Sequence, residues 1–341
     1  MPRYVIIGAG AVGASLAAQF ALTGIDYVLI GRGAQVNHIR QHGLTFQRPG
    51  GSRQIALEAF DVADAPELHS DDVLLLTVKS QDAASALAFW SWRNVSGTDA
   101  PAATAVPIVT FQNGLATEAA ALRTFARVYG ASILTPARFT QTGTVVAAGE
   151  PELGIVTVGR FPSGDDKTSK QIATDLKRAG YLAEVTNDIR RWKAAKLLHN
   201  VGNVLELFDG AETLREIVGA AIIEEARQAL AAAGYTFASP SERTVDISNW
   251  RVAPDSGIVR GQQSTWQSFT RGASSEVDFL NGEIVLLGRL HGIATPYNEV
   301  VQALAGELAQ RGTFTAPLPL EAIISRLDGV DPSPPALAVG T

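Results

Sequence analysis

The chain has 341 residues, of which 46% are apolar and 18% are charged. Because this is longer than the chain that usually folds around a single hydrophobic core, we predict two domains. Its formal net charge of −6 argues against binding to nucleic acid, which needs clustered basic residues to neutralise phosphate. The lack of cysteine excludes disulfides and thiolate metal sites, and no charge-free apolar run is long enough to span a membrane. We expect a cytoplasmic protein without a membrane segment.

The first half of the chain alternates short β-branched runs with helix-like stretches, which is typical of a doubly wound α/β sheet. Residues 11–22 are predicted to form the first helix, directly after the first strand. Residues 73–78 form a continuous apolar run, as expected of a parallel strand buried on both faces. The predicted strands, in chain order, are residues 4–7, 27–30, 73–78, 107–111, 131–134, 143–148 and 154–158.

From Ile189 onward the pattern is mainly helical, with Ala-rich and Leu-rich periodic stretches up to Leu327. The proline-containing end that follows is predicted to be flexible. We therefore predict a doubly wound sheet domain over residues 1–188, a mainly α-helical domain over residues 189–327 and a tail over residues 328–341.

A glycine-rich turn separates the first predicted strand from its helix. It reads Gly8-Ala9-Gly10-Ala11-Val12-Gly13, and the surrounding residues lack the basic lead-in and cleavage site of a secretory signal. The three glycines permit a tight turn, close approach of backbone N–H groups to a pyrophosphate, and close packing of helix on strand. The start of the helix adds a partial positive charge. All six residues are therefore candidate ligands of a dinucleotide in a Rossmann-type domain.

The residue after the second predicted strand distinguishes between the two nicotinamide cofactors. An NAD-binding chain usually has a carboxylate there, which accepts hydrogen bonds from the ribose hydroxyls, whereas this chain has Arg32. A planar guanidinium suits a 2′-phosphate. We therefore predict NADP(H) as the cofactor; the alternative is that Arg32 is a solvated surface residue.

Several motifs occur in an order that resembles the ketopantoate reductase (2-dehydropantoate 2-reductase) family, part of a wider 6-phosphogluconate-dehydrogenase-like group, over about residues 3–312. After the glycine turn and Arg32 comes Val78-Lys79-Ser80-Gln81, which is similar to a Val-Lys-x-x-Gln element but has its glutamine one residue early. The next motifs are Gln112-Asn113-Gly114, Lys196 with Asn200, and Ser264 with Glu276. The last is residues 291–298, which are similar to His-Gly-x-x-x-Pro-x-Asn. The resemblance implies NADPH-dependent reduction of a 2-keto acid to a 2-hydroxy acid, with 2-dehydropantoate and pantoate as the first choice.

Lys196, Asn200 and Asn203 share one face of a predicted helix. An ammonium on such a face can stabilise and protonate the carbonyl oxygen of a 2-keto acid as hydride arrives. By resemblance Lys196 is the catalytic acid and a substrate contact, with Lys193 as the alternative acid, and Asn200 binds substrate. The family's second asparagine, eight residues after the lysine, is Val204 here, and the shift to Asn203 turns the amide by about 100° on an α-helix. Asn203 is thus a candidate substrate ligand, with a capping or interhelical role as the alternative.

The resemblance also implies the remaining site residues. Ser264 would bind the substrate carboxylate, and Glu276 would contact the nicotinamide end of the cofactor and hold the catalytic lysine in its charged form. Asn113 follows a buried strand at the carboxyl edge of the sheet, where this fold binds ligands, and would contact cofactor and substrate. Lys79 would lie near cofactor phosphate or ribose, and Ala137 would offer only its backbone.

The segment after Ser264 reads Thr265-Trp266-Gln267-Ser268, where the family has Met-Leu-Gln-Asp. Because a tryptophan would reshape the substrate pocket, another 2-oxo acid or an imine stays open as substrate, although a core role is commoner for tryptophan. A third hypothesis is a non-catalytic NADPH-binding regulator. The sequence leaves open whether the protein is a monomer or a homodimer. The five histidines lack the spacing of metal ligands, so we expect no bound metal.

Overall fold

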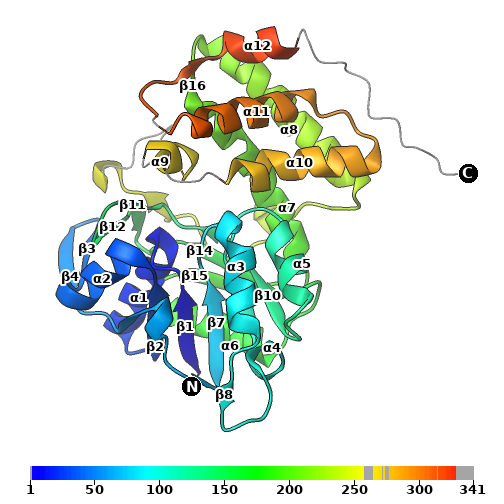
Figure 1. The fold of residues 1–341 in the computed structure, drawn as a ribbon. Helices are drawn as coiled ribbons and strands as arrows, with labels where there is room; N and C mark the ends of the chain where they lie inside the picture. The colour runs from blue at the N-terminus through cyan, green and yellow to red at the C-terminus, as the bar shows by residue number, and fades with distance from the viewer. Residues whose placement is uncertain (1, 257–263, 271, 273–275, 313, 328–341) are drawn as a thin grey trace, which may run out of the picture. The chain divides into compact units, whose positions relative to one another are not determined.

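The structure is a computed structural model that describes residues 2–256, 264–270, 272, 276–312 and 314–327. The chain divides into two compact units (Figure 1). Unit 1 comprises Met1–Gln112, Thr117–Trp192 and Ser239–Ile258, and unit 2 comprises Asn113–Ala116, Lys193–Ala238 and Val259–Thr341. The predicted domain boundary after residue 188 stays a prediction, and the predicted tail lies outside the described residues.

Unit 1 is built on an eight-stranded sheet with the order β15-β14-β10-β9-β7-β1-β2-β5. Neighbouring strands are parallel except for β10 and β14, which pair antiparallel. The bounds are β1 Arg3–Ile7, β2 Tyr27–Gly31, β5 Ala59–Asp61, β7 Asp72–Leu76, β9 Ile108–Thr110, β10 Val128–Leu134, β14 Ile155–Arg160 and β15 Leu182–Val185. Six of the predicted strands therefore form in this sheet, and the seventh forms in a smaller one.

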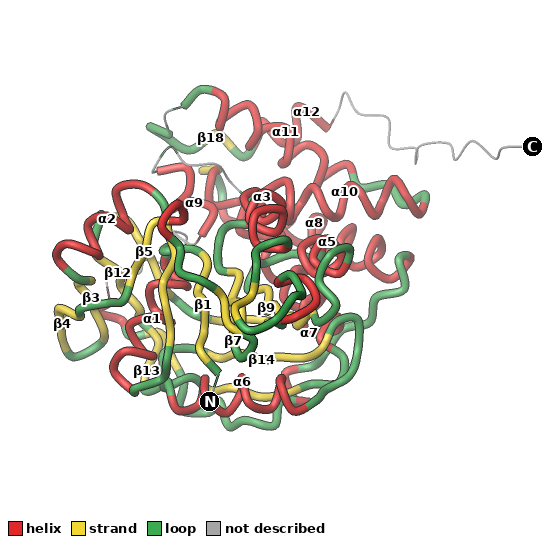
Figure 2. The backbone as a smooth tube through the Cα atoms, turned by 60° about the horizontal axis from the view of Figure 1, so that its bottom comes forward, coloured by secondary structure: helices red, strands yellow, loops and turns green. Residues whose placement is uncertain are grey.

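Helices cover both faces of the large sheet, because alternate side chains of a strand point to opposite faces. On β1, Tyr4 and Ile6 belong to the core shared with α1 and α6, whereas Val5 and Ile7 belong to the core shared with α3 and α5. Figure 2 shows α3 and α6 on opposite sides of the strands. The bounds of these helices are α1 Ala11–Thr23, α3 Ser80–Ser91, α5 Ala116–Leu122 and α6 Lys167–Arg178.

Unit 1 also contains a four-stranded sheet with the order β11-β12-β3-β4. Its strands are β3 Leu44–Arg48, β4 Gly51–Ile55, β11 Ala137–Gln141 and β12 Thr144–Ala147. The sequence predicted only β12 of these. Four of the five residues of β4 are exposed, so this edge strand lacks the alternation of apolar and polar residues that reveals a half-buried strand.

Unit 2 is mainly helical and also contains the short strand pair β16 Phe208–Asp209 and β18 Leu318–Pro319 (Figure 1). Helix α7 begins at Ile189, the residue at which the helical pattern was predicted to begin. Its C-terminal part packs through Leu197 into a core that includes Ile222, Ile284 and Val301 from three longer helices. Those helices are α8 Glu212–Ala232, α10 Val277–His291 and α11 Pro296–Gln310, and α12 Glu321–Leu327 follows them. A Rossmann-type sheet followed by a helical domain confirms the predicted fold class.

Residues 291–298, the His-Gly-x-x-x-Pro-x-Asn stretch, form the turn from α10 to α11. Gly292 ends α10 with φ of 68°, the left-handed conformation that glycine adopts at low cost. Pro296 takes the first position of α11, where its missing N–H breaks no helical hydrogen bond. The motif therefore has a local structural reason.

Candidate functional site

The glycine turn connects β1 to α1 in unit 1, as its sequence predicts. Gly8 has φ of 122°, and a Cβ atom there would lie 2.7 Å from the backbone nitrogen of Val78. A Cβ atom on Gly13 would overlap the carbonyl oxygen of Gly8. Glycine at both positions therefore lets β1, α1 and the end of β7 pack closely.

The start of α1 has the features of a phosphate site. Gly10 caps this helix without a side-chain hydrogen bond, and the first turn, all of it described, has no acidic residue. A Cβ atom on Gly10 would have no described atom within 4 Å, so the backbone there is accessible. The first N–H groups of a helix lack intrahelical acceptors and carry partial positive charge. Residues 8–13 therefore fit the pyrophosphate of a dinucleotide.

Arg32 and Lys79 immediately precede α2 Gly33–His42 and α3, the helices that follow β2 and β7, and these two strands flank β1. The carboxyl ends of parallel strands share one sheet edge, so both residues lie at the edge that carries the glycine turn. The Arg32 side chain is 65% exposed, and its Nη2 lies 3.1 Å from Oδ1 of Asp82 in the first turn of α3. Lys79 is half-buried. The sequence did not predict the pairing of Arg32 with Asp82.

The Gln-Asn-Gly turn contributes a structural residue beside a candidate ligand. Nε2 of Gln112 donates to the carbonyl oxygens of Leu76 (3.0 Å) and Val78 (2.8 Å), which ties the ends of β9 and β7 together in unit 1. Asn113, the predicted contact of cofactor and substrate, is half-buried and groups with unit 2. Ala137 begins β11 and is half-buried in unit 1.

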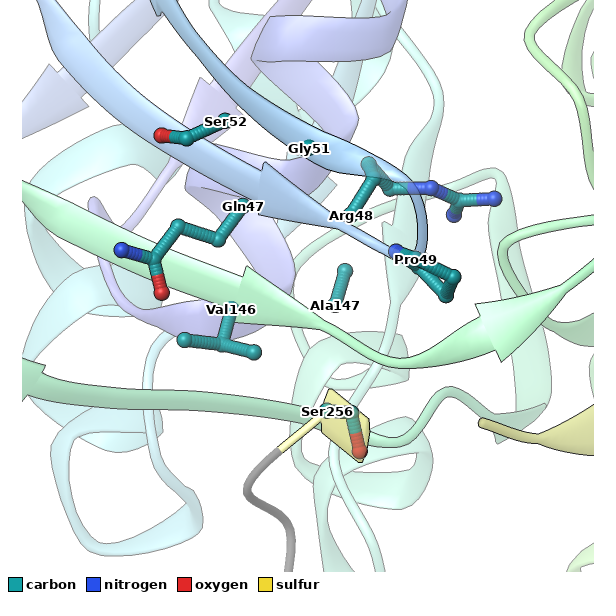
Figure 3. Close-up of a pocket in the computed structure, with 8 residues that line it drawn as sticks. All are labelled: Gln47, Arg48, Pro49, Gly51, Ser52, Val146, Ala147 and Ser256. Carbon is teal, nitrogen blue, oxygen red and sulfur yellow. The ribbon is translucent and has the colours of Figure 1, made fainter. Parts of the chain in front are cut away.

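A cavity of about 190 Å³ lies in unit 1. Its lining residues are Gln47, Arg48, Pro49, Gly51, Ser52, Val146, Ala147 and Ser256, none of which is a predicted site residue (Figure 3). Burial lowers the pKa of Arg48, whose Nη2 donates to the carbonyl oxygen of Pro151 at 3.1 Å. Figure 3 shows the Arg48 guanidinium and the Gln47 amide extending to opposite sides, so these polar groups do not converge on a ligand.

The predicted substrate face lies on α7 Ile189–Asn200 and on the 3₁₀ helix η2 Val201–Leu207 that continues it. Lys196 is half-buried, and Asn200 and Asn203 are buried, with 4% and 8% exposure. Residues three apart eclipse each other in a 3₁₀ helix. Asn200 immediately precedes η2, so Asn203 lies closer to the side of the helix that carries Asn200 than it would on a continued α-helix.

Other charged residues of α7 lie near Lys196. Lys193, the alternative acid, precedes it by about one turn and is 4% exposed. Partial burial and the positive charge of Lys196 lower the pKa of His199. The ammonium of Lys196 is therefore close enough to act on the imidazole ring.

Two further candidate residues begin helices in unit 2. Glu276 immediately precedes α10 and is 7% exposed. Ser264 begins α9 Ser264–Thr270, but its side chain lies outside the described residues. In the same helix Trp266 is half-buried, and its backbone nitrogen donates to Oε2 of Glu206 at 3.4 Å.

Two buried amides support the turn that follows α7, and the sequence reasoning gave them no role. Nδ2 of Asn281 donates to the carbonyl oxygen of Val201 (3.0 Å) and to Oδ1 of Asn298 (3.1 Å). Nδ2 of Asn298 donates to the carbonyl oxygen of Ile222 (3.1 Å) and to Oε2 of Glu225 (2.8 Å). The available signal was their position among apolar residues of helices, where an asparagine must find partners. This network connects α8, α10 and α11 to the start of η2.

Among the residues that the structure describes, no group of three or more histidine or acidic side chains could hold a metal ion. Within the same residues, no helix combines the length and the apolar character that crossing a membrane requires.

Comparisons with known proteins match almost the whole chain. A family model described as ketopantoate reductase PanE/ApbA matches residues 4–163, and the model of its C-terminal part matches residues 188–309. The chain is 28% identical over 309 residues to the 2-dehydropantoate 2-reductase of Pyrococcus horikoshii, covering 89% of this chain and 96% of the relative. It is 27% identical over 307 residues to that of Archaeoglobus fulgidus, covering 88% and 95%.

Solved structures show the same fold. A PanE/ApbA family ketopantoate reductase from Ralstonia eutropha superposes with a TM-score of 0.72 at 23% identity, covering 91% of this chain and 99% of that one. D-mandelate dehydrogenase, solved with NADH and anilino(oxo)acetate, superposes with a TM-score of 0.73 at 20% identity and the same coverage. The two family models span the glycine turn, the helix of Lys196 and the start of α10 in the order expected for one family. The chain belongs to the ketopantoate reductase family.

Proposed function

We propose that this protein reduces 2-dehydropantoate to pantoate with NADPH. Family membership and the names of the curated relatives support this reaction. The observation that carries it is the row of Lys196, Asn200 and Asn203 along α7 and η2, one half-buried ammonium followed by two buried amides. The same relatives do not favour another 2-oxo acid, an imine substrate or a non-catalytic regulator.

In the proposed reaction Lys196 binds the C2 carbonyl oxygen of the substrate and donates a proton as negative charge develops there. Its half-buried side chain supports this role over that of Lys193, which is almost inaccessible. The amides of Asn200 and Asn203 hold polar groups of the substrate, and this row suits a small molecule that carries several oxygens.

The other two predicted residues of unit 2 complete the proposed substrate side. Ser264 donates its hydroxyl to the substrate carboxylate. Glu276 is the partner that keeps the catalytic lysine charged, because a nearby carboxylate offsets the cost of burying an ammonium.

Bound NADPH supplies the hydride that reaches the C2 carbon. The backbone N–H groups of residues 11–13 bind the pyrophosphate at the start of α1, and Arg32 binds the 2′-phosphate. Lys79 is a proposed phosphate or ribose contact, and Ala137 is a proposed contact to the cofactor through its backbone only. Asn113 and Glu276 are proposed contacts toward the nicotinamide end. The accessible cradle around Gly10 supports the pyrophosphate assignment.

The cytoplasmic location and the oligomeric state stay predictions. The fold also occurs in a dimeric ketopantoate reductase from Staphylococcus aureus, with a TM-score of 0.67 at 17% identity. Proteins with this fold can therefore be homodimers, and a measurement of the mass of this protein in solution would determine its oligomeric state.

The experiment for the proposed function follows the absorbance of NADPH with ketopantoate and with a panel of branched 2-oxo acids. We expect the highest kcat/KM with ketopantoate, and pantoate as the product. A higher kcat/KM with a panel member would contradict the substrate assignment, and tight NADPH binding without turnover of any acid would favour a regulator. The variant Trp266→Leu, which restores the family residue, shows whether Trp266 sets KM for ketopantoate.

A further inference from the structure

Asp82 places a carboxylate on the arginine that is proposed to recognise NADPH. Its Oδ1 lies 3.1 Å from Nη2 of Arg32, and both residues belong to unit 1. Asp82 is in the first turn of α3, where the partial positive charge of the helix start favours an acidic side chain. The backbone nitrogen of Asp82 donates to the carbonyl oxygen of Lys79 at 2.9 Å, so the acid is fixed on its helix beside a second candidate ligand.

The sequence explains why this carboxylate is unusual. The Val-Lys-x-x-Gln element has a neutral glutamine three residues after its lysine, and in this chain that position is Asp82, because the glutamine, Gln81, comes one residue early. A glutamine can share the Arg32 guanidinium with a ligand at no cost in charge. A carboxylate competes with the ligand for the guanidinium and repels it.

We propose that Asp82 lowers the preference of this protein for NADPH over NADH. This inference rests on the proposed role of Arg32 as the ligand of the 2′-phosphate. When NADPH binds, the 2′-phosphate must replace the Asp82 carboxylate on Arg32 or share Arg32 with it, and it then carries its own negative charge next to Asp82. NADH lacks the 2′-phosphate, so its binding avoids both costs. The side chains are 65% and 41% exposed, so solvent moderates the effect and the pair can open.

The expected change in NADPH affinity can be estimated from the interaction energies of solvent-exposed charges. Loss of one exposed ion pair changes an equilibrium by up to about fivefold. Repulsion between a bound phosphate and a nearby carboxylate in a water-like medium adds a further, smaller factor, which salt screens. Removal of the Asp82 charge should therefore strengthen NADPH binding about five- to tenfold.

The test measures the dissociation constants of NADPH and NADH by quenching of tryptophan fluorescence, without substrate. The variants are Asp82→Asn, Arg32→Gln and the double variant. Asp64→Asn is the matched control, because Asp64 forms another exposed pair in unit 1, with Arg40 at 3.6 Å. Adenosine 2′,5′-bisphosphate and 5′-AMP serve as smaller probes that differ only in the 2′-phosphate.

We expect Asp82→Asn to lower Kd for NADPH and for the bisphosphate about five- to tenfold and to change Kd for NADH and 5′-AMP less than twofold. In the Arg32→Gln background the effect of Asp82→Asn on Kd for NADPH should be clearly smaller, because only the direct repulsion between the carboxylate and the 2′-phosphate is then relieved. Asp64→Asn should change none of these constants. An unchanged affinity of Asp82→Asn for NADPH would overturn the inference, because Asp82 would then have no influence on the cofactor. A weaker affinity would overturn it as well, because Asp82 would then position Arg32 for the 2′-phosphate. Failure of the unsubstituted protein to bind NADPH would instead refute the proposed cofactor, and the inference with it.

Discussion

Replacement of Asn298 by alanine removes a fully buried amide that connects three helices. The side chain donates to Ile222 on α8 at 3.1 Å and to Glu225 on α8 at 2.8 Å, and it accepts from Asn281 on α10 at 3.1 Å. Alanine removes this donor from the buried carbonyl oxygen of Ile222. It also removes one of the donors that stabilise the ionised form of Glu225.

The lost hydrogen bonds set the magnitude. A bond to a neutral carbonyl contributes about 0.5–1.5 kcal/mol and a bond to a charged group about 1.5–3 kcal/mol, and a buried group left unpaired adds a desolvation cost. We therefore expect Asn298→Ala to lower the free energy of unfolding by about 3–5 kcal/mol. For a unit of this size the melting temperature should fall by roughly 10 °C.

The loss should depend on pH because burial raises the pKa of Glu225, while hydrogen bonds from Tyr297 and Asn298 lower it. Loss of the Asn298 amide raises that pKa further. A carboxyl group with a raised pKa contributes stability when it is protonated and loses that contribution as pH rises through the folded-state pKa. Asn298→Ala should therefore be more destabilised at about pH 7 than at about pH 4.

The assay is calorimetric unfolding of the two variants Asn298→Ala and Asn37→Ala across this pH range. Asn37 is an exposed asparagine on α2 Gly33–His42, so its replacement controls for the loss of an amide that bridges nothing buried. Equal melting temperatures of the two variants, or a loss in Asn298→Ala that does not change with pH, would refute the reasoning about this network.

Four further predictions concern the candidate ligands. Gly13→Ala should weaken NADPH binding at least about tenfold in a fluorescence titration, because its Cβ overlaps the Gly8 carbonyl oxygen; an unchanged Kd would contradict the turn's role. Arg32→Asp should shift the ratio of NADPH to NADH affinity toward NADH by about tenfold or more. An unchanged ratio would mean that Arg32 does not bind the 2′-phosphate. Asn203→Ala should raise KM for ketopantoate about tenfold and leave KM for NADPH unchanged, whereas an unchanged KM for ketopantoate would indicate a structural role. Lys196→Met should raise the pKa of His199, measured by NMR, because it removes a nearby positive charge; no change would mean that the two side chains lie apart.

The sequence predicted the parts of this structure that have local causes. The glycine turn, the strand before it and α1 follow from residue types that a tight connection from a strand to a helix requires. The apolar run at β7 is predictable for the same reason, because a strand buried on both faces needs apolar residues throughout. Helix α7 begins at the predicted residue, so the face that carries Lys196 could be derived from spacing alone.

Features that depend on distant contacts were not predictable. The change from α7 to η2 at Val201 alters the alignment of Asn203, and the amide that holds the Val201 carbonyl comes from Asn281, 80 residues later. Asp82 contacts an arginine 50 residues earlier, and nothing local distinguishes it from a solvated acid at a helix start. The roles of Ser264, Glu276 and Asn113 came from the family resemblance and remain predictions.

The most direct test of the central claim compares Lys196→Ala with Lys193→Ala in steady-state reduction of ketopantoate by NADPH, with Kd for NADPH measured alongside. We predict that Lys196→Ala lowers kcat about 10²- to 10⁴-fold, the range for loss of a general acid, and leaves Kd for NADPH within about twofold. Lys193→Ala should keep a much larger share of kcat once its folding is verified by its melting temperature. Retained turnover in Lys196→Ala, or the larger loss in a folded Lys193→Ala, would contradict the account.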